Sequence, residues 1–225
     1  MFSVVLPVYI FNEHLLNSTV DAVNSFGNVE LIIIDNASTL GGGWLRQRAN
    51  IYIRNQINLG YAKAVNQGIK LANGKHIAIA SNDVVVKGDW QNVATDVFKE
   101  PCATCHFKVG EGIGKDVYYT GRERWCTAAF FVMRDKNYFN ENFLNSFEDW
   151  ELFHRLRLQG GRTAYTNKAT YLHNHSLTKR YNLDTISKDN KNLENFIKIY
   201  GKHPDELMNE LYPLQMREKY LEGFL

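Results

Sequence analysis

The sequence predicts an α/β protein in which helices cover a mostly parallel sheet. Three observations lead to this prediction. Apolar runs of strand length alternate with stretches of helical periodicity along the N-terminal half. Polar or turn-forming residues follow each of those runs directly, and strands separated by helices pair in parallel through right-handed crossovers. The chain has 225 residues with 44% hydrophobic content, enough for one large domain, or a domain with an appendage, around a substantial core.

Four apolar runs predict the strands of the N-terminal half, at residues 2–6, 31–34, 51–53 and 77–80. The first of them is expected to end before Pro7. Apolar residues at helical spacing predict helices over 13–26 and about 61–71, with Gly27 and Gly74 as their stops. The triplet Gly41-Gly42-Gly43 is interpreted as a flexible loop.

The C-terminal half is harder to interpret. Residues 117–119 and 127–133 are expected to be strands, the second of them inside the sheet. A helix is expected after residue 147, with Ser146 as its N-cap and Asp149 in a capping-box position. Two extended pieces, 163–165 and 171–176, precede an amphipathic helix that starts at residue 189.

Polar residues follow each N-terminal strand at the point where it ends. Because parallel strands end at the same edge of a sheet, these side chains should meet in one crevice, where open α/β sheets bind ligands. The Gly-rich loops of dinucleotide and P-loop sites are missing, so a bound pyrophosphate would need a metal ion or basic side chains. The residues are Tyr9 and Asn12, Asp35 and Asn36, Asn55 and Asn58, and Asn82 and Asp83. An ordinary strand-to-turn corner is the alternative for Asn82 and Asp83.

Composition and cysteine content restrict the function classes. The net charge of +2 permits an anionic ligand but does not indicate nucleic acid binding. The first residues lack the positive n-region of a signal peptide, and with three cysteines we expect a reduced, cytoplasmic setting. Cys102 and Cys105, followed by His106, match the spacing of c-type haem attachment, and with Cys126 they could bind zinc. We favour thiols in a turn between strands.

Several segments, taken in order, resemble glycosyltransferase family 2, whose members are inverting nucleotide-sugar transferases with the GT-A fold. They are VVLPVY with Asn12, LIIIDNAST, NQINLGYAKAVNQGIKLANGKHI, SNDVV, FFVMRDKNYFNENFLNSFEDWELFHRLRLQGGR and LHNHS. The resemblance spans residues 2–180. It implies a GT-A domain over 1–180, with a nucleotide-sugar-binding half at 1–99 and an acceptor half at 100–180. Residues 181–225 would form a C-terminal helical extension.

The resemblance also implies roles for individual residues. Asp35 would contact the nucleotide base in a pocket lined by Pro7, Val8 and Tyr9, while Asn58, Asn82 and Arg180 (or Lys179) would complete the donor site. Asp83 stands where the family carries its DxD motif and would hold Mn²⁺ or Mg²⁺. Because Ser81 replaces the first carboxylate of that motif, either metal binding is weak or His173 or His175 supplies the second ligand. Thr127-Ala128-Ala129, where the family often has glycine, and the two apolar residues between Tyr9 and Asn12 are further departures.

The implied reaction is inverting transfer of a sugar from a nucleoside diphosphate, UDP first, to an acceptor hydroxyl. Asp149 is the expected general base, with Glu148 beside it to orient the acceptor or the base; the reverse assignment fits the same residues. Acidic residues are also favoured in a first helical turn by the helix dipole, which is the structural alternative for both. The acceptor stays open among polysaccharides, teichoic acids, lipid-linked sugars, proteins and modified DNA bases.

Three other functions compete with this interpretation. A catalytically silent nucleotide- or sugar-binding module would explain the incomplete DxD motif. A sugar-phosphate nucleotidyltransferase would need a Gly-rich basic loop after the first strand, and a nicotinamide enzyme would need GxGxxG; the sequence has neither. The C-terminal helices could also bind a partner chain or a membrane surface, or support an oligomer.

Overall fold

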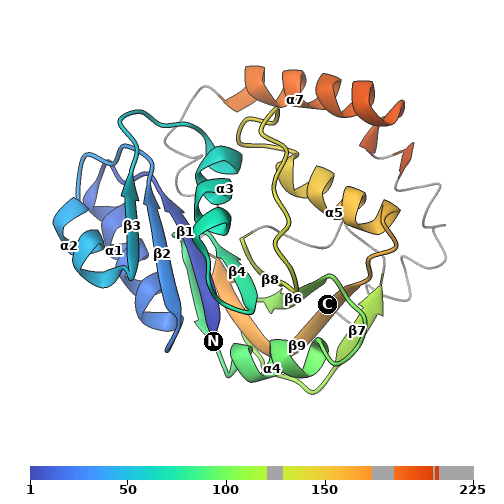
Figure 1. Cartoon of the computed structure of the whole chain (residues 1–225), viewed down its shortest axis with the longest axis horizontal. Helices are drawn as coiled ribbons and strands as arrows, with labels where there is room; N and C mark the ends of the chain where they lie inside the picture. Colours follow the sequence, from blue (N-terminus) through green and yellow to red (C-terminus); the bar gives the residue numbers. More distant parts are fainter. Residues whose placement is uncertain (121–128, 174–184, 205, 208–225) are drawn as a thin grey trace.

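The computed structural model describes residues 1–120, 129–173, 185–204 and 206–207 (Figure 1). Within these residues nine strands form one sheet, in the order β3-β2-β1-β4-β8-β6-β9-β5, with β7 paired to β9. The strands are β1 (Phe2–Val8), β2 (Glu30–Asp35), β3 (Ile51–Arg54), β4 (His76–Ala80), β5 (Val84–Lys87), β6 (Thr104–Val109), β7 (Val117–Thr120), β8 (Phe130–Met133) and β9 (Thr163–His173). The helices are α1 (Glu13–Ser25), α2 (Gly42–Arg48), α3 (Tyr61–Leu71), α4 (Trp90–Val97), α5 (Glu148–Leu158) and α7 (Thr185–Tyr200).

The first four strands pair in parallel, as predicted. Their carboxyl ends therefore lie along one edge of the sheet. The structure corrects the end of β1, because the strand continues through Pro7 to Val8. Pro7 pairs with β2 alone, since the ladder between β1 and β4 ends at Val5, and a missing N–H is tolerated where one side of a strand is unpaired.

The rest of the sheet is mixed, so the mostly parallel prediction holds only for the N-terminal half. Strand β8 runs antiparallel to both β4 and β6, while β6 and β9 are parallel. Strands β5 and β7 are both antiparallel to β9. The apolar run of β8 is buried along its whole length, and such a run carries no periodicity that distinguishes one strand direction from the other.

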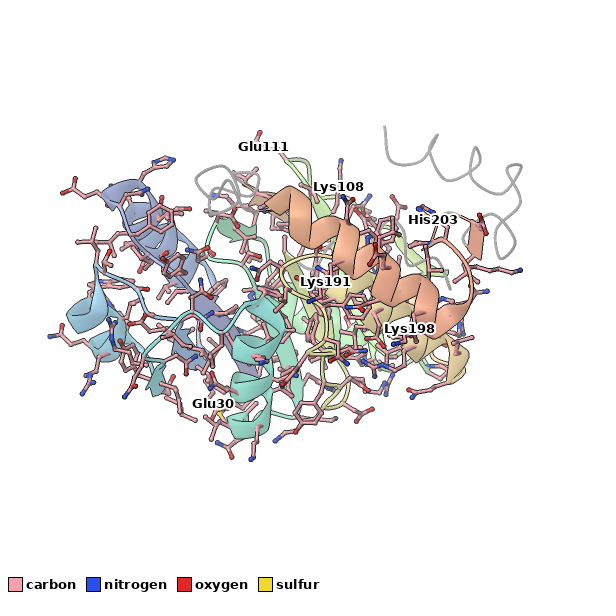
Figure 2. The ribbon with its side chains drawn as sticks, turned by 90° about the horizontal axis from the view of Figure 1, so that it is seen from above. Glu30, Lys108, Glu111, Lys191, Lys198 and His203 are labelled. Atoms are coloured by element: carbon pink, nitrogen blue, oxygen red, sulfur yellow. The ribbon has the colours of Figure 1, made fainter. Side chains whose placement is uncertain are left out.

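Helices cover both faces of the sheet. On one face, α1, α2 and α4 pack through Leu15, Leu45 and Trp90. On the other, α3 and α5 pack through Val65 and Phe153. Helix α7 lies outside α5, as both views show (Figures 1 and 2). None of the described helices is long and apolar enough to cross a membrane.

Local expectations for two stretches were wrong. The glycine triplet is not a loop, because Gly42 and Gly43 form the first residues of α2 and Leu45 buries that helix against the sheet. Helix α4, which Asp89 caps, was not predicted. Cys105 and His106 lie inside β6 rather than in a turn, and both side chains are buried.

Three further boundaries differ from the expectations. Residues 163–173 form a single strand rather than two separate pieces. Between the two expected pieces, Thr166 donates to the Asp116 carbonyl, and Asn167 Nδ2 donates to the Asp116 carboxylate. The N-cap of α5 is Phe147, not Ser146, whose hydroxyl accepts a hydrogen bond from Asn192 instead. Helix α7 begins at Thr185, four residues earlier than expected. Residues 127–128 and 174–176 of the predicted strands lie outside the described residues.

Candidate active site

Asp35 lies at the carboxyl end of β2, next to Val8 of β1 and Arg54 of β3 in the strand register. Its side chain is fully buried. Oδ1 accepts a hydrogen bond from the Ser38 backbone N–H at 2.7 Å, and Oδ2 accepts one from the Tyr52 hydroxyl at 2.6 Å and one from the Arg54 guanidinium. A buried carboxylate is tolerated where donors surround it in this way.

The surroundings of Asp35 raise the pKa values of both Tyr52 and Arg54. Burial raises the pKa of Tyr52, and its hydrogen bond with Asp35 raises it further. The pKa of Arg54 is also raised, first by hydrogen bonding with Tyr52 and then by the charge of Asp35. Tyr52 therefore stays neutral and Arg54 stays charged, and the three side chains form one hydrogen-bonded cluster.

A pocket of about 390 Å³ adjoins this cluster. Arg46 and Arg54 make it basic, and hydroxyl groups add neutral donors and acceptors. Its lining residues are Ser38, Thr39, Gly42, Gly43, Arg46, Tyr52 and Arg54. Such a lining suits a polar or anionic ligand that presents hydrogen-bond acceptors.

Amide side chains shape the loop between β3 and α3. Asn36 Nδ2 donates to Asn58 Oδ1 at 2.6 Å, and Asn58 Oδ1 also accepts from the Gly60 N–H at 2.9 Å. Asn36 Oδ1 accepts from the Leu59 N–H at 2.9 Å and from the Asn55 side chain at 3.1 Å. Asn58 itself is exposed to solvent. This network fixes the point at which α3 begins, and with it the position of Tyr61.

Asp83 and His173 are far apart in the sequence but close together in the fold. Strands β5 and β9 pair so that Val84 lies opposite His173, which brings His173 Nε2 to 3.3 Å from Asp83 Oδ1. The turn that carries Asp83 is held on both sides: the Ser81 N–H donates to the Ala129 carbonyl at 2.7 Å, and Asn82 Nδ2 donates to Thr19 at 3.2 Å. The Asn82 side chain thus points toward α1.

The donor atoms of this pair fit a divalent cation only in part. A carboxylate suits Mn²⁺ or Mg²⁺, and an imidazole nitrogen suits Mn²⁺ better than Mg²⁺. No group of three or more His, Cys, Asp or Glu side chains that could hold a metal occurs in the part of the chain that the structure describes. A cation held by Asp83 and His173 would therefore take its other ligands from water and from substrate phosphates, as Mg²⁺ sites commonly do. His175, Lys179 and Arg180 lie outside the described residues.

The acidic pair opens α5, as predicted. Glu148 is buried, and Asp149 is half-buried. Asp149 Oδ1 accepts the N–H of Trp150 at 2.9 Å, so part of its charge is stabilised by the first turn of its own helix.

Tyr61 links the acidic pair to the turn after β4. Burial raises the pKa of its phenol well above the ordinary value of 10.0. The negative charges of Glu148, Asp149 and Asp83 raise that pKa further, while hydrogen bonding with Ser81 opposes the change. The same tyrosine donates its backbone N–H to Asn145 Oδ1 at 2.9 Å. A neutral phenol thus lies among the carboxylates that come from two distant parts of the sequence.

The structure groups the predicted site residues into two regions of one edge. Asp35, Pro7, Val8 and Asn58 lie at the ends of β1 to β3, where the Tyr9 ring packs on Phe11 with centroids 5.3 Å apart. The charges of Asp83, Glu148 and Asp149 act on Tyr61, and His173 lies beside Asp83. Asn12 caps α1 by accepting the Leu15 N–H.

Sequence reasoning missed Tyr52, Arg54 and Tyr61 as site residues. Positions 52 and 54 alternate in a short strand and therefore point the same way, which is a signal that could have found them. Tyr61 follows a glycine at a helix start, and nothing in that position indicates the carboxylates around it. Cys102 and Cys105 are buried, and burial raises the pKa of both thiols, which keeps them protonated and unreactive. Cys126 lies outside the described residues.

Comparison with known proteins places these observations in context. The family model described as "Glycosyl transferase family 2" matches residues 3–174. A related protein, Glycosyltransferase GlyG of Streptococcus pneumoniae serotype 4, is 25% identical over 211 residues, which cover 77% of this chain and 70% of that protein.

Two solved structures share the fold. S. aureus TarS (residues 1–349) in complex with UDP has a TM-score of 0.60 at 17% identity, over 97% of this chain and 77% of that one. The mannosyltransferase PcManGT from Pyrobaculum calidifontis, in complex with GDP-Man and Mn²⁺, has a TM-score of 0.63 at 14% identity, over 92% of this chain and 67% of that one. The predicted GT-A fold class is confirmed.

Proposed function

Because this chain belongs to glycosyl transferase family 2 and is a glycosyltransferase, we propose that it inverts the anomeric centre of a sugar as it moves that sugar from a nucleoside diphosphate to an acceptor hydroxyl. One observation carries the proposal. The charges of Asp83, Glu148 and Asp149 all act on the Tyr61 phenol, which supports a diphosphate site at Asp83 close to a general base at the start of α5.

The donor would bind with its base near Asp35 and its diphosphate near Asp83. The family resemblance assigns Asp35 as an acceptor for the base, and Arg54 beside it lines the pocket as a donor, so a base that presents an imino N–H next to a carbonyl would suit both. Uracil and guanine have this pattern, whereas adenine and cytosine do not. We favour a UDP-sugar, with Pro7, Val8 and Tyr9 lining the base pocket and Asn58 and Asn82 holding the loops around it. TarS, solved with UDP, and PcManGT, solved with GDP-Man, share this fold.

Asp83 and His173 would hold Mn²⁺ or Mg²⁺ at the diphosphate. When bound, such an ion offsets the charge that develops on the departing diphosphate. His175 and Arg180 stay candidates for a further ligand and for added positive charge, on the strength of the sequence alone.

Asp149 would act as the general base. Its carboxylate accepts the proton of the acceptor hydroxyl as that oxygen attacks the anomeric carbon from the side opposite the diphosphate. The new bond to oxygen forms while the bond to the β-phosphate oxygen breaks, which inverts the centre. Glu148 would orient the acceptor or the base. The raised pKa of Tyr61 means that its phenol keeps its proton and is a neutral donor beside the carboxylates.

We extend the proposal to the organisation of the chain. Residues 1–99 would bind the nucleotide-sugar and residues 100–180 the acceptor, with 181–225 as a helical extension. The acceptor class follows from none of the described contacts. A silent nucleotide-binding module is the second candidate, since Ser81 stands in place of a carboxylate in the DxD position.

Replacement of the acidic pair tests the proposal. The assay measures release of UDP or GDP from a panel of UDP- and GDP-sugars, with water as acceptor, alongside affinity for the free nucleotide. Asp149→Asn should lower turnover by about 10²- to 10⁴-fold, the usual contribution of a general base, and leave nucleotide affinity unchanged. Glu148→Gln separates the two carboxylates, and Asp135→Asn, an exposed carboxylate outside the site, serves as control.

Two results would contradict the assignment. If Asp149→Asn and Glu148→Gln both keep full turnover, neither carboxylate is the base. If either variant loses nucleotide affinity and thermal stability together with turnover, the pair has a structural role. A wild type that binds nucleotide but turns over no donor would support the silent module.

A further inference from the structure

The segment that leads into α5 has an unusual backbone. Asn145 and Phe147 both have positive φ, 61° and 62°. Asparagine adopts this left-handed conformation readily, but a bulky aromatic residue does so only where its surroundings enforce it. Phe147 is also the N-cap of α5, and its side chain makes no capping hydrogen bond. The direction in which α5 presents Glu148 and Asp149 therefore depends on contacts that hold residues 144–147 from outside.

Asn192 of α7 supplies such contacts. Its side chain is almost fully buried, with 1% of its surface exposed. Its Oδ1 accepts the Leu144 N–H at 3.1 Å, and its Nδ2 donates to the Leu144 carbonyl at 3.0 Å and to Ser146 Oγ at 2.7 Å. One amide thus bonds both the main chain and a side chain of the segment, on either side of Asn145.

Aromatic packing strengthens the same junction. The Phe147 ring lies 5.4 Å from Trp150 of α5 and 6.4 Å from Phe196 of α7, measured between centroids. Phe196 also packs on Phe143 at 6.5 Å. The Tyr61 N–H at the start of α3 donates to Asn145 Oδ1. The left-handed segment is therefore in contact with both α3 and α7.

We propose that Asn192 is a positioning residue for the transfer reaction, and that α7 is thereby part of the catalytic machinery rather than an appendage. Asn192 acts through residues 144–147, and this segment fixes where the first turn of α5 places the general base. This inference rests on the proposed function of Asp149 and Glu148. A displaced base deprotonates the acceptor poorly, while the donor pocket at β1 to β3 is untouched, so the loss should fall on turnover and not on nucleotide binding.

The test compares variants of the full chain in three measurements. These are turnover of the best UDP- or GDP-sugar, affinity for UDP or GDP, and hydrogen exchange of the backbone amides of residues 145–152. Asn192→Ala removes the bonds to residues 144 and 146. Ser146→Ala removes only the bond to the hydroxyl, and keeps the test open if the first variant folds poorly. Asn195→Ala is the matched control, because Asn195 donates from the same helix to the Asn142 carbonyl, ahead of the left-handed segment. Lys198→Ala is a second control, because Lys198 lies on the exposed side of α7 (Figure 2).

We expect Asn192→Ala to lower turnover by about 100-fold, the cost of a small misplacement of a reacting group, and to leave nucleotide affinity unchanged. Amides 145–152 should exchange faster, and Ser146→Ala should show a smaller change in the same direction. The inference fails if Asn192→Ala matches Asn195→Ala in turnover and exchange, or if nucleotide affinity falls in step with turnover. If the wild type shows no turnover but Asn192→Ala still exchanges faster at residues 145–152, the structural link is retained and the proposed function alone is refuted.

Discussion

His106 should make the stability of this protein depend on pH in a way that a single substitution removes. The side chain is 1% exposed, and neither ring nitrogen has a hydrogen-bond partner among the residues that the structure describes. Its ring stacks on Phe131 at 5.1 Å and meets Phe153 of α5 edge-on at 4.8 Å. Burial lowers its pKa from 6.5 to about 3, so the folded protein holds it neutral.

The sign and size of the effect follow from linkage. Below pH 6.5 the unfolded chain binds a proton at this residue that the folded chain does not, so stability falls as the pH falls. Between pH 7 and pH 5 the loss from His106 alone is about 2 kcal/mol. It continues until the pH approaches the folded pKa of about 3.

The assay is urea unfolding of wild type and His106→Leu at a series of pH values. The leucine variant has no proton to bind, so the difference between the two proteins should grow in its favour by about 2 kcal/mol from pH 7 to pH 5. Other titrating groups cancel in this difference. Parallel pH profiles for the two proteins would refute the conclusion that His106 is buried and neutral.

Two further predictions concern stability. Burial alone would raise the pKa of Glu30, but hydrogen bonds from Ser3 and Asn73 outweigh burial and lower it. The stabilisation that this carboxylate contributes is therefore complete above pH 4.5 and is lost as the pH falls through the folded pKa. Glu30→Gln should cost about 1–3 kcal/mol at pH 7 by chemical denaturation, and the cost should shrink as the pH is lowered below 4.5; a cost that does not change with pH would contradict this. Gly68→Ala would place a Cβ 2.4 Å from Val5 Cγ1. The cost of this overpacking, about 1–3 kcal/mol, should exceed the gain of about 1 kcal/mol in helix propensity, so the variant should be less stable than the wild type. Gly43→Ala is the control: its Cβ would meet no described atom within 4 Å, so this variant should be more stable, and a rise in Tm for both variants would show that α3 can move away from β1.

The sequence predicted well where the first four strands end and which polar residues follow them, for a physical reason. Buried parallel strands leave a strong apolar signal, and polar residues at their ends, such as Asp35 and Asp83, must lie on one edge. The contact between Asp83 and His173 was anticipated only as one of two options. It depends on the antiparallel pairing of β5 with β9, which an apolar run does not encode.

The surroundings of Glu148 and Asp149 were less predictable. The family resemblance pointed to Glu148 and Asp149, but their helix was expected to start from a Ser146 cap. The structure starts it from a left-handed phenylalanine, because Asn192 takes the Ser146 hydroxyl. Contacts across such a separation in sequence, and the approach of Tyr61 to the carboxylates, arise from tertiary packing that overrides local propensity.

Thermal unfolding with nucleotides tests the central claim most directly, namely that the edge with Asp35 and Asp83 binds a nucleotide-sugar donor. Wild type and Asp83→Asn would be compared with UDP, GDP, CDP and ADP, each with and without Mn²⁺. At a hundredfold excess over its dissociation constant, a ligand of the native state adds about 2.7 kcal/mol. We predict stabilisation of the wild type by UDP or GDP that increases with Mn²⁺, and loss of the Mn²⁺ dependence in Asp83→Asn. No shift with any nucleotide, or an equal Mn²⁺ response in both proteins, would contradict the account.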